Sequence, residues 1–153
     1  MANELFNVAG KVVVMTGGAG VLGKGISKYL AAQGAKMVVL DRSEEAGKAL
    51  VDEIVAQGHE ATFLYTDVMN KEVLEQNKKD ILEKYGRIDV LLNAAGGNMA
   101  GATIAPDKTF FDLQVDAFKK GSRFESFRNC IAYDGLCRCN GETEKRFYRK
   151  LLL

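Results

Sequence analysis

The sequence predicts an α/β fold: a Rossmann-like, doubly wound parallel sheet, truncated to about four strands, with an irregular C-terminal tail. Two observations predict this fold. Short apolar runs alternate with longer segments in which apolar residues recur every three or four positions, and glycines stand at most of the boundaries. Such alternation favours a parallel sheet with right-handed crossovers and helices on both faces. Ligands of these sheets bind beyond the carboxyl ends of the strands where strand order reverses, here expected between the first and fourth strands.

The strands and helices follow from their periodicities. Buried strands are expected at residues 11–16, 36–40, 61–65 and 88–93. Helices are expected at 22–33, from a Ser43 cap to 57, and at 70–85, each stopped by a glycine (Gly34, Gly58 and Gly86). The pattern also allows a helix over 106–120. The inward-facing helical residues are expected to be Leu22, Ile26, Leu30, Leu50, Ile54, Val73, Leu74, Ile81, Leu82 and Tyr85.

Length and composition exclude several classes of protein. The chain has 153 residues, which suggests one domain, and a net charge of +1, which gives no reason to expect nucleic acid or an acidic membrane as a partner. No run approaches the ~18 apolar residues of a membrane span, and the first residues do not resemble a signal peptide. We therefore expect a cytoplasmic protein. Its three cysteines, an odd number, argue against a disulfide framework.

Two unequal parts meet near Lys120. Residues 1–120 show clear hydrophobic periodicity and hold no cysteine, whereas 121–153 hold all three cysteines and five of the seven arginines. Cys130, Cys137 and Cys139 could form a zinc site with His59, but their spacing lacks the paired ligands of structural zinc sites. We expect no metal, and we divide the chain into a cofactor-binding half-domain at 1–120 and an atypical tail at 121–153.

Glycines at the end of the first strand form the main motif. Gly18, Gly20 and Gly23 match G-x-G-x-x-G between an expected strand and an expected helix. Glycine is needed there because the chain turns sharply, its backbone approaches a pyrophosphate, and the helix packs against the strand. The free N–H groups of the helix terminus then bind the phosphates. The alternative is a strand-to-helix turn with spare glycines.

Asp41, which ends the second strand, follows Gly23 by 18 residues. A carboxylate there can accept hydrogen bonds from both ribose hydroxyls and repels a 2′-phosphate, which favours NAD over NADP. Arg42 weakens that preference, because an arginine can accommodate the phosphate. The alternative for Asp41 is a solvated turn residue or a helix cap.

Four segments together resemble the conventional short-chain dehydrogenase/reductase family over residues 6–120: GKVVVMTGGAGVLG, Asp41, Thr66-Asp67-Val68 and GRIDVLLNAAG. The resemblance implies that Asp67 and Val68 lie near the adenine. It also implies that residues 93–96 support the central sheet and border the nicotinamide ribose. The predicted cofactor-binding residues are Gly17, Gly18, Gly20, Leu22, Gly23, Asp41, Arg42, Asp67, Val68, Asn93, Ala94, Ala95 and Gly96.

One position departs from the family pattern, which would place glycine at Val21. Gly17, Gly20 and Gly23 also match G-x-x-G-x-x-G, the spacing of nucleotide-sugar epimerases and dehydratases. The end of the fourth strand, LNAAG, favours the conventional branch instead. TGGAGVLG with NAAGGN further resembles a subgroup that oxidises and reduces sugar acids, such as D-mannonate (fructuronate) oxidoreductases.

The family's catalytic motif is missing from the sequence. The resemblance implies catalysis by Asn, Ser and a Tyr-x-x-x-Lys pair, and none of the five tyrosines has a lysine four residues on. We therefore predict no catalytic residue. The expected function is an NAD-dependent oxidoreductase, present as a truncated fragment, whose intact relatives act on small molecules and are homo-oligomers. The alternatives are a non-catalytic dinucleotide-binding module and an epimerase or dehydratase fragment.

The tail suggests a change of reading frame. If the codons from Gly121 are read one base later, permitted codons through Lys150 encode VVDLNLFGTVLPMMAFADAMVKQKKGSIV. That sequence resembles the family's next helix, with its Asn in LNLFG, and its fifth strand. We hypothesise a one-base insertion in the codons for Lys119 and Lys120, followed by out-of-frame translation to an early stop.

Overall fold

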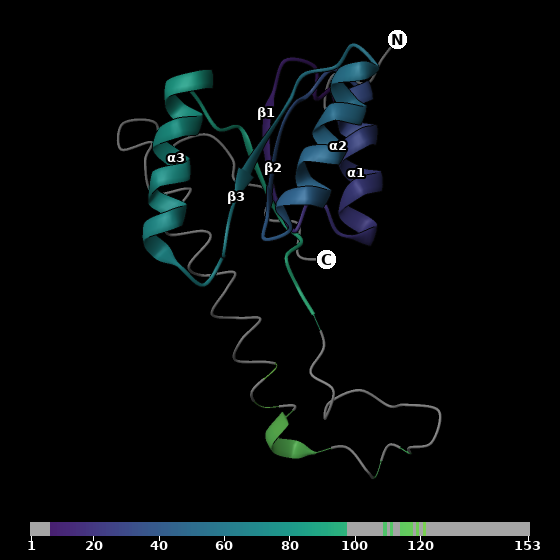
Figure 1. The fold of residues 1–153 in the computed structure, drawn as a ribbon, viewed down its shortest axis with the longest axis vertical. Helices are drawn as coiled ribbons and strands as arrows, with labels where there is room; N and C mark the ends of the chain where they lie inside the picture. The colour runs from purple at the N-terminus through teal and green to yellow at the C-terminus, as the bar shows by residue number, and fades with distance from the viewer. Residues whose placement is uncertain are drawn as a thin grey trace.

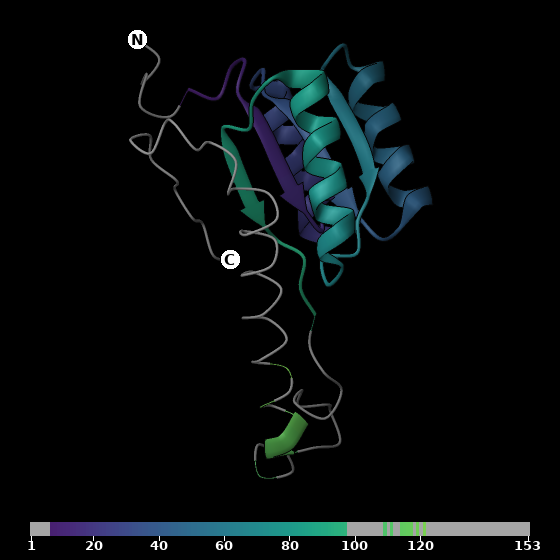
Figure 2. The same ribbon diagram turned by 90° about the vertical axis from the view of Figure 1, so that its left-hand side faces the viewer.

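Alternating strands and helices form one parallel sheet, as predicted. A computed structural model describes residues 7–97, 109, 111, 114–117, 119 and 121. Its elements are β1 (Val12–Thr16), α1 (Val21–Ala32), β2 (Lys36–Asp41), α2 (Glu44–Ala56), β3 (Ala61–Tyr65), α3 (Lys71–Tyr85) and β4 (Val90–Asn93). All neighbouring strands are parallel and the order is β3-β2-β1-β4. The order therefore reverses between β1 and β4, as expected, and Figure 2 shows both strands ending at one edge of the sheet.

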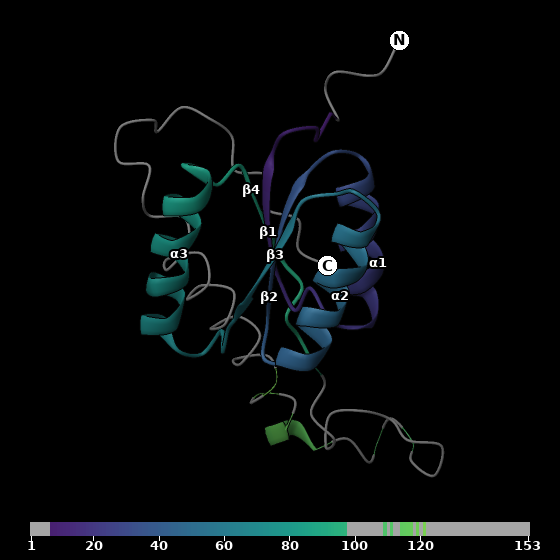
Figure 3. The same ribbon diagram turned by 45° about the horizontal axis from the view of Figure 1, so that its top comes forward.

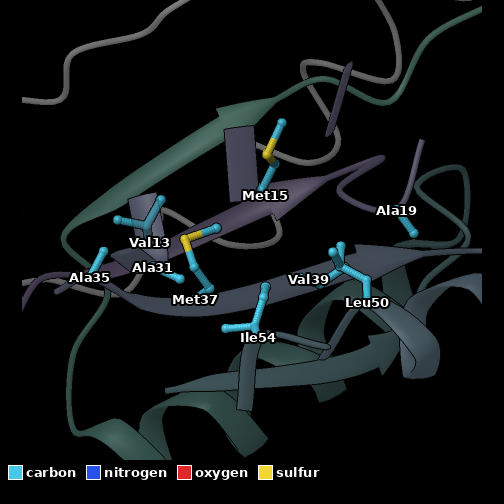
Figure 4. Close-up of a cluster of buried hydrophobic side chains, with 9 residues drawn as sticks. All are labelled: Val13, Met15, Ala19, Ala31, Ala35, Met37, Val39, Leu50 and Ile54. Carbon is cyan, nitrogen blue, oxygen red and sulfur yellow. The ribbon is translucent and has the colours of Figure 1, made fainter. Parts of the chain in front are cut away.

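Helices cover both faces of the sheet. Figures 1 and 3 show α1 and α2 on one face and α3 on the other. Side chains of β1 and β2 alternate between the two layers, as the period of a strand requires. On the α1–α2 side, Val13, Met15, Met37 and Val39 pack with Ala31, Leu50 and Ile54 (Figure 4). On the α3 side, Val12, Val14, Val38 and Leu40 pack with Leu74 and Ile81.

Helix boundaries follow local chemistry. The Ser43 hydroxyl accepts a hydrogen bond from the Ala46 N–H, so the predicted cap of α2 is confirmed. Asn70 caps α3 by accepting from the N–H groups of Glu72 and Val73. Gly34, Gly58 and Gly86 all have positive φ just beyond the helices, the backbone conformation that glycine adopts without strain. The three predicted glycine stops are therefore confirmed.

The structure corrects two sequence predictions. The fourth strand begins at Val90 rather than residue 88, because Asp89 uses its carboxylate to hold the start of β1. The prediction that Leu22 faces inward is wrong: its side chain is 74% exposed, and the buried residues of α1 are Gly23, Ser27 and Ala31. Helical period placed Leu22 on the face of Ile26 and Leu30, but the most deeply buried face of α1 is formed by the small residues Gly23, Ser27 and Ala31, one position further around the helix.

The predicted helix over 106–120 lies mostly outside the described residues, although 115–117, 119 and 121 are helical. The three cysteines also lie outside them. Among the residues that are described, no helix is long and apolar enough to cross a membrane, and no three His, Cys, Asp or Glu residues are grouped as metal ligands would be.

Candidate functional site

The turn between β1 and α1 is packed so tightly that only glycine fits at two of its positions. Gly17 has φ +65°, and a Cβ added to it would lie 2.7 Å from the backbone nitrogen of Ala95. A Cβ on Gly23 would lie 2.2 Å from the Gly17 carbonyl oxygen. The Ser27 hydroxyl donates to the Gly18 carbonyl from within α1 at 3.4 Å. Glycine therefore allows the helix terminus, the turn and the loop after β4 to meet.

The amino end of α1 offers unsatisfied backbone donors. Gly20 is the N-cap residue and provides no side-chain cap, and the first turn contains no acidic residue. Within the described part of the chain, no hydrogen bond involves the N–H groups of Val21, Leu22 or Gly23. The first N–H groups of a helix carry a partial positive charge and attract anions, phosphates above all.

Asp41 lies beside this turn at the end of β2. Its Oδ2 accepts a hydrogen bond from the Ala19 N–H at 3.1 Å, and its Oδ1 accepts one from the Ser43 N–H at 3.0 Å. The carboxylate thus joins the glycine turn to the start of α2 and is half-buried, whereas Arg42 is exposed. Asp41 is the one described acidic residue bonded to the glycine turn, and each oxygen retains a lone pair for a further donor.

The loop after β4 is attached to the end of β1. The Ala94 N–H donates to the Thr16 carbonyl oxygen at 3.1 Å, and the Ala95 N–H donates to Thr16 Oγ1 at 3.2 Å. Ala94 and Ala95 are half-buried and Gly96 is exposed. Asn93 is buried, and among the described residues its Oδ1 has no hydrogen-bond partner.

The turn after β3 completes the edge. The Thr66 N–H donates to the Asp41 carbonyl oxygen at 2.9 Å, which holds this turn beside the end of β2. Asp67 Oδ1 accepts from the Met69 N–H at 2.9 Å, and Val68 is buried. All the predicted site residues therefore lie in four connected segments along the carboxyl edge of the sheet.

Sequence reasoning missed several supporting residues. Asp89 Oδ2 accepts from the Val12 N–H at 2.9 Å, while its Oδ1 pairs with Arg87. Gly47 lets α2 approach β3, since a Cβ there would lie 2.1 Å from the Phe63 ring. Asn77 donates to Tyr65 and Thr66 from α3. Both helix residues could have been noticed in the sequence, because Asn77 is a polar residue and Gly47 a glycine on an otherwise apolar helix face.

Two pKa shifts belong to surface pairs of the helices. Lys48 hydrogen-bonds Glu44 and lowers its pKa, and Lys28 does the same for Glu53, which joins α1 to α2. These pairs are exposed, where ion pairs contribute little to stability. They lie on the helices and not in the four site segments.

A comparison with known families agrees with this geometry. The family model for short chain dehydrogenases matches residues 11–121, from β1 past the loop after β4. The chain belongs to the short-chain dehydrogenase family. Its glycine turn, the end of β2 and the LNAAG segment all fall within the matched residues.

Among curated proteins, the chain is 39% identical over 120 residues to UxuB of Bacillus subtilis, an uncharacterized oxidoreductase, covering 73% of this chain and 43% of that one. It is 33% identical over 115 residues to (2S)-[(R)-hydroxy(phenyl)methyl]succinyl-CoA dehydrogenase subunit BbsD of Thauera aromatica, covering 75% of this chain and 46% of that one. The chain thus spans less than half the length of these relatives.

Solved structures agree on the fold. A proposed D-mannonate oxidoreductase from Haemophilus influenza with bound NAD superimposes with a TM-score of 0.75 and 27% identity, over 86% of this chain and 51% of that one. An NAD-bound xylitol dehydrogenase gives a TM-score of 0.71 and 25% identity, over 86% and 48% of the two chains.

Proposed function

We propose that this short-chain dehydrogenase chain binds NAD at the carboxyl edge of its sheet and is the cofactor-binding part of an oxidoreductase. The observation that carries the proposal is the glycine turn, where a helix terminus offers three bare N–H groups beside a half-buried carboxylate. Backbone donors of this kind suit a diphosphate, and a turn built of glycines lets the backbone approach it closely. The residues present therefore fit a dinucleotide.

Asp41 supports NAD rather than NADP in this proposal. Its carboxylate is held in place by Ala19 and Ser43, so its remaining lone pairs can accept from ribose hydroxyls. A 2′-phosphate at the same place would meet a negative charge. Arg42 is exposed at the neighbouring position and could offset part of that repulsion. Calorimetric titration of the whole chain tests the preference, and tighter binding of NADP than of NAD would refute it.

The proposed reaction of the intact protein is hydride transfer between a nicotinamide and a secondary alcohol or ketone. The bound dinucleotide would supply or accept the hydride. The residues of this chain would bind and orient it: the turn at 17–23 holds the diphosphate, Asp41 the ribose, Asp67 and Val68 the adenine side, and 93–96 the nicotinamide side. A sugar acid is the proposed substrate class, supported by the likeness to the proposed D-mannonate oxidoreductase.

A second candidate function is a dinucleotide-binding module without catalysis. It is favoured by the absence of Tyr-x-x-x-Lys anywhere in the 153 residues. That pair matters because tyrosine has an unperturbed pKa near ~10 and needs a cationic neighbour to act as an acid or base near neutrality. Both functions predict NAD binding. Because the chain lacks this pair, we expect incubation with NAD and sugar acids to give binding without turnover, and NADH formation would contradict the module.

We also propose that residues 121–153 are read out of frame. The proposal is supported by the family match, which ends at residue 121 where the shifted reading begins. Sequencing the gene across the codons for Lys119 to Leu153 tests it, since codons incompatible with the shifted reading would refute it.

We further propose that the protein is cytoplasmic and that the intact protein is a homo-oligomer. A reducing compartment suits an odd number of cysteines.

A further inference from the structure

A buried asparagine lies on the inner face of α3 among apolar neighbours. Asn77 is 7% exposed and shares this face with Leu74 and Ile81, which are fully buried and pack α3 against the sheet. Burying an amide costs free energy unless its polar atoms find partners. An apolar side chain would suit the packing at this position better, so the partners of Asn77 explain its presence.

The amide of Asn77 makes two hydrogen bonds to the end of β3. Its Nδ2 donates to the Tyr65 carbonyl oxygen at 2.9 Å and to Thr66 Oγ1 at 2.7 Å. The orientation of the amide is fixed by its partners. A carbonyl oxygen can only accept, and the Thr66 hydroxyl already donates to the Leu64 carbonyl at 3.1 Å. Both N–H bonds of the amide are therefore used.

Thr66 connects Asn77 to the candidate site. Its backbone N–H donates to the Asp41 carbonyl oxygen at 2.9 Å, and Asp67 and Val68 follow it directly. Thr66 is 1% exposed, so this connection is shielded from water. Hydrogen bonds in such places hold backbone segments more firmly than exposed ones do. Asn77 thus acts on the turn that follows β3 and is hydrogen-bonded to the end of β2.

We propose that Asn77 is a positioning residue for the adenosine end of the bound dinucleotide. It fixes Tyr65 and Thr66 and thereby sets the turn at Asp67 and Val68 against the end of β2. Asn77 itself touches no ligand. The inference rests on the proposed function, because it assumes that adenosine lies between these two segments.

The test compares two ligands that share the diphosphate. ADP would contact both the glycine turn and the adenosine side, whereas inorganic pyrophosphate would contact the glycine turn alone. The variant Asn77→Leu keeps an apolar inner face on α3 but removes both donors. In calorimetric titrations of the whole chain, we expect it to weaken ADP binding roughly five- to tenfold, the effect of one or two lost hydrogen bonds. We expect pyrophosphate binding to be unchanged.

Ile81→Val is the matched control. It loosens the packing of α3 one turn further along the same face but leaves Tyr65 and Thr66 paired. It should lower the melting temperature and leave ADP affinity unchanged, which separates positioning from general destabilisation of the helix. Thr66→Val provides a second variant should Asn77→Leu fail to fold. It removes the hydroxyl that accepts a hydrogen bond from Asn77, so ADP binding should weaken. The double variant Asn77→Leu/Thr66→Val should bind ADP only slightly more weakly than either single variant.

Four results would overturn the inference. If the unaltered chain and Asn77→Leu bind ADP with equal affinity, Asn77 does not position the adenosine end, and the proposed function is unaffected. An equal loss of ADP and pyrophosphate binding, or a loss in Ile81→Val as large as in Asn77→Leu, would make the effect a general one. Failure of the unaltered chain to bind either ligand would refute the proposed function itself, and the inference with it.

Discussion

Gly17 approaches Ala95 so closely that a Cβ on Gly17 would lie 2.7 Å from both the nitrogen and the Cα of Ala95. These two residues follow β1 and β4, the strands between which the order of the sheet reverses. The close approach joins the glycine turn to the loop after β4. The carboxyl edge of the sheet is therefore a single connected surface, and substitutions at either end of this contact should affect both stability and the proposed binding.

Gly17→Ala should destabilise the chain by more than its backbone conformation alone requires. A non-glycine residue at positive φ costs about 1–2 kcal/mol, and the overlap with Ala95 adds to that. Gly58→Ala is the matched control, because Gly58 also has positive φ but open space around it. Urea denaturation should show a loss of about 1–2 kcal/mol for Gly58→Ala and a clearly larger loss for Gly17→Ala. Equal losses would mean that Gly17 and Ala95 are not in contact.

Two glycines of α1 should respond to alanine in opposite directions. A Cβ on Gly23 would overlap the Gly17 carbonyl, so Gly23→Ala should cost about 1–3 kcal/mol by overpacking and should abolish NAD binding by moving the turn. Gly25 has nothing near its Cβ position, so Gly25→Ala should stabilise the helix by about 0.5–1 kcal/mol and leave NAD affinity as it was. Loss of NAD binding in Gly25→Ala would contradict the assignment of the site to this turn.

Asp41→Asn should weaken NAD binding and reduce the preference for NAD over NADP. The amide has one acceptor oxygen in place of two and carries no charge. It therefore cannot accept hydrogen bonds from the Ala19 N–H, the Ser43 N–H and a ribose hydroxyl as the carboxylate can. We expect NAD affinity to fall roughly tenfold and NADP affinity to change less. The affinity ratio comes from paired calorimetric titrations. Asp52→Asn, an exposed position on α2, is the control and should leave that ratio unchanged.

The side chain of Leu22 should contribute almost nothing to stability. Because it is exposed, Leu22→Ala should change the free energy of unfolding by less than about 0.5 kcal/mol. Leu50→Ala removes a fully buried side chain from α2 and should cost about 2–5 kcal/mol. Chemical denaturation of both variants provides the comparison. A large loss in Leu22→Ala would show that this residue is covered in solution.

The order of elements and most site positions could be predicted from local sequence. Glycine spacing, the Ser43 cap and the glycine stops depend on residues only a few positions apart, so a linear pattern contains them. The place of Asp41 follows from its distance along the chain to Gly23. Its hydrogen bond to Ala19 does not, because that bond joins two strand ends that only the folded sheet brings together.

The errors have the same physical origin. The helical period of Leu22, Ile26 and Leu30 marks an apolar stripe, but the small residues Gly23, Ser27 and Ala31 form the most deeply buried face, because only small side chains allow close packing there. The start of β4 depends on Asp89 meeting the Val12 N–H, a contact across 77 residues. Asn77 is polar in sequence and buried in the structure, and only its partners at the end of β3 explain why.

The binding of a diphosphate by the start of α1 can be measured by a ¹H–¹⁵N NMR titration of the chain with NAD. We predict the largest amide shifts at residues 17–23, with smaller shifts near Asp41, and almost none at Gly58 and Gly86, which lie at the ends of helices outside the site. Saturating NAD that leaves the amides of Val21, Leu22 and Gly23 unmoved would contradict it.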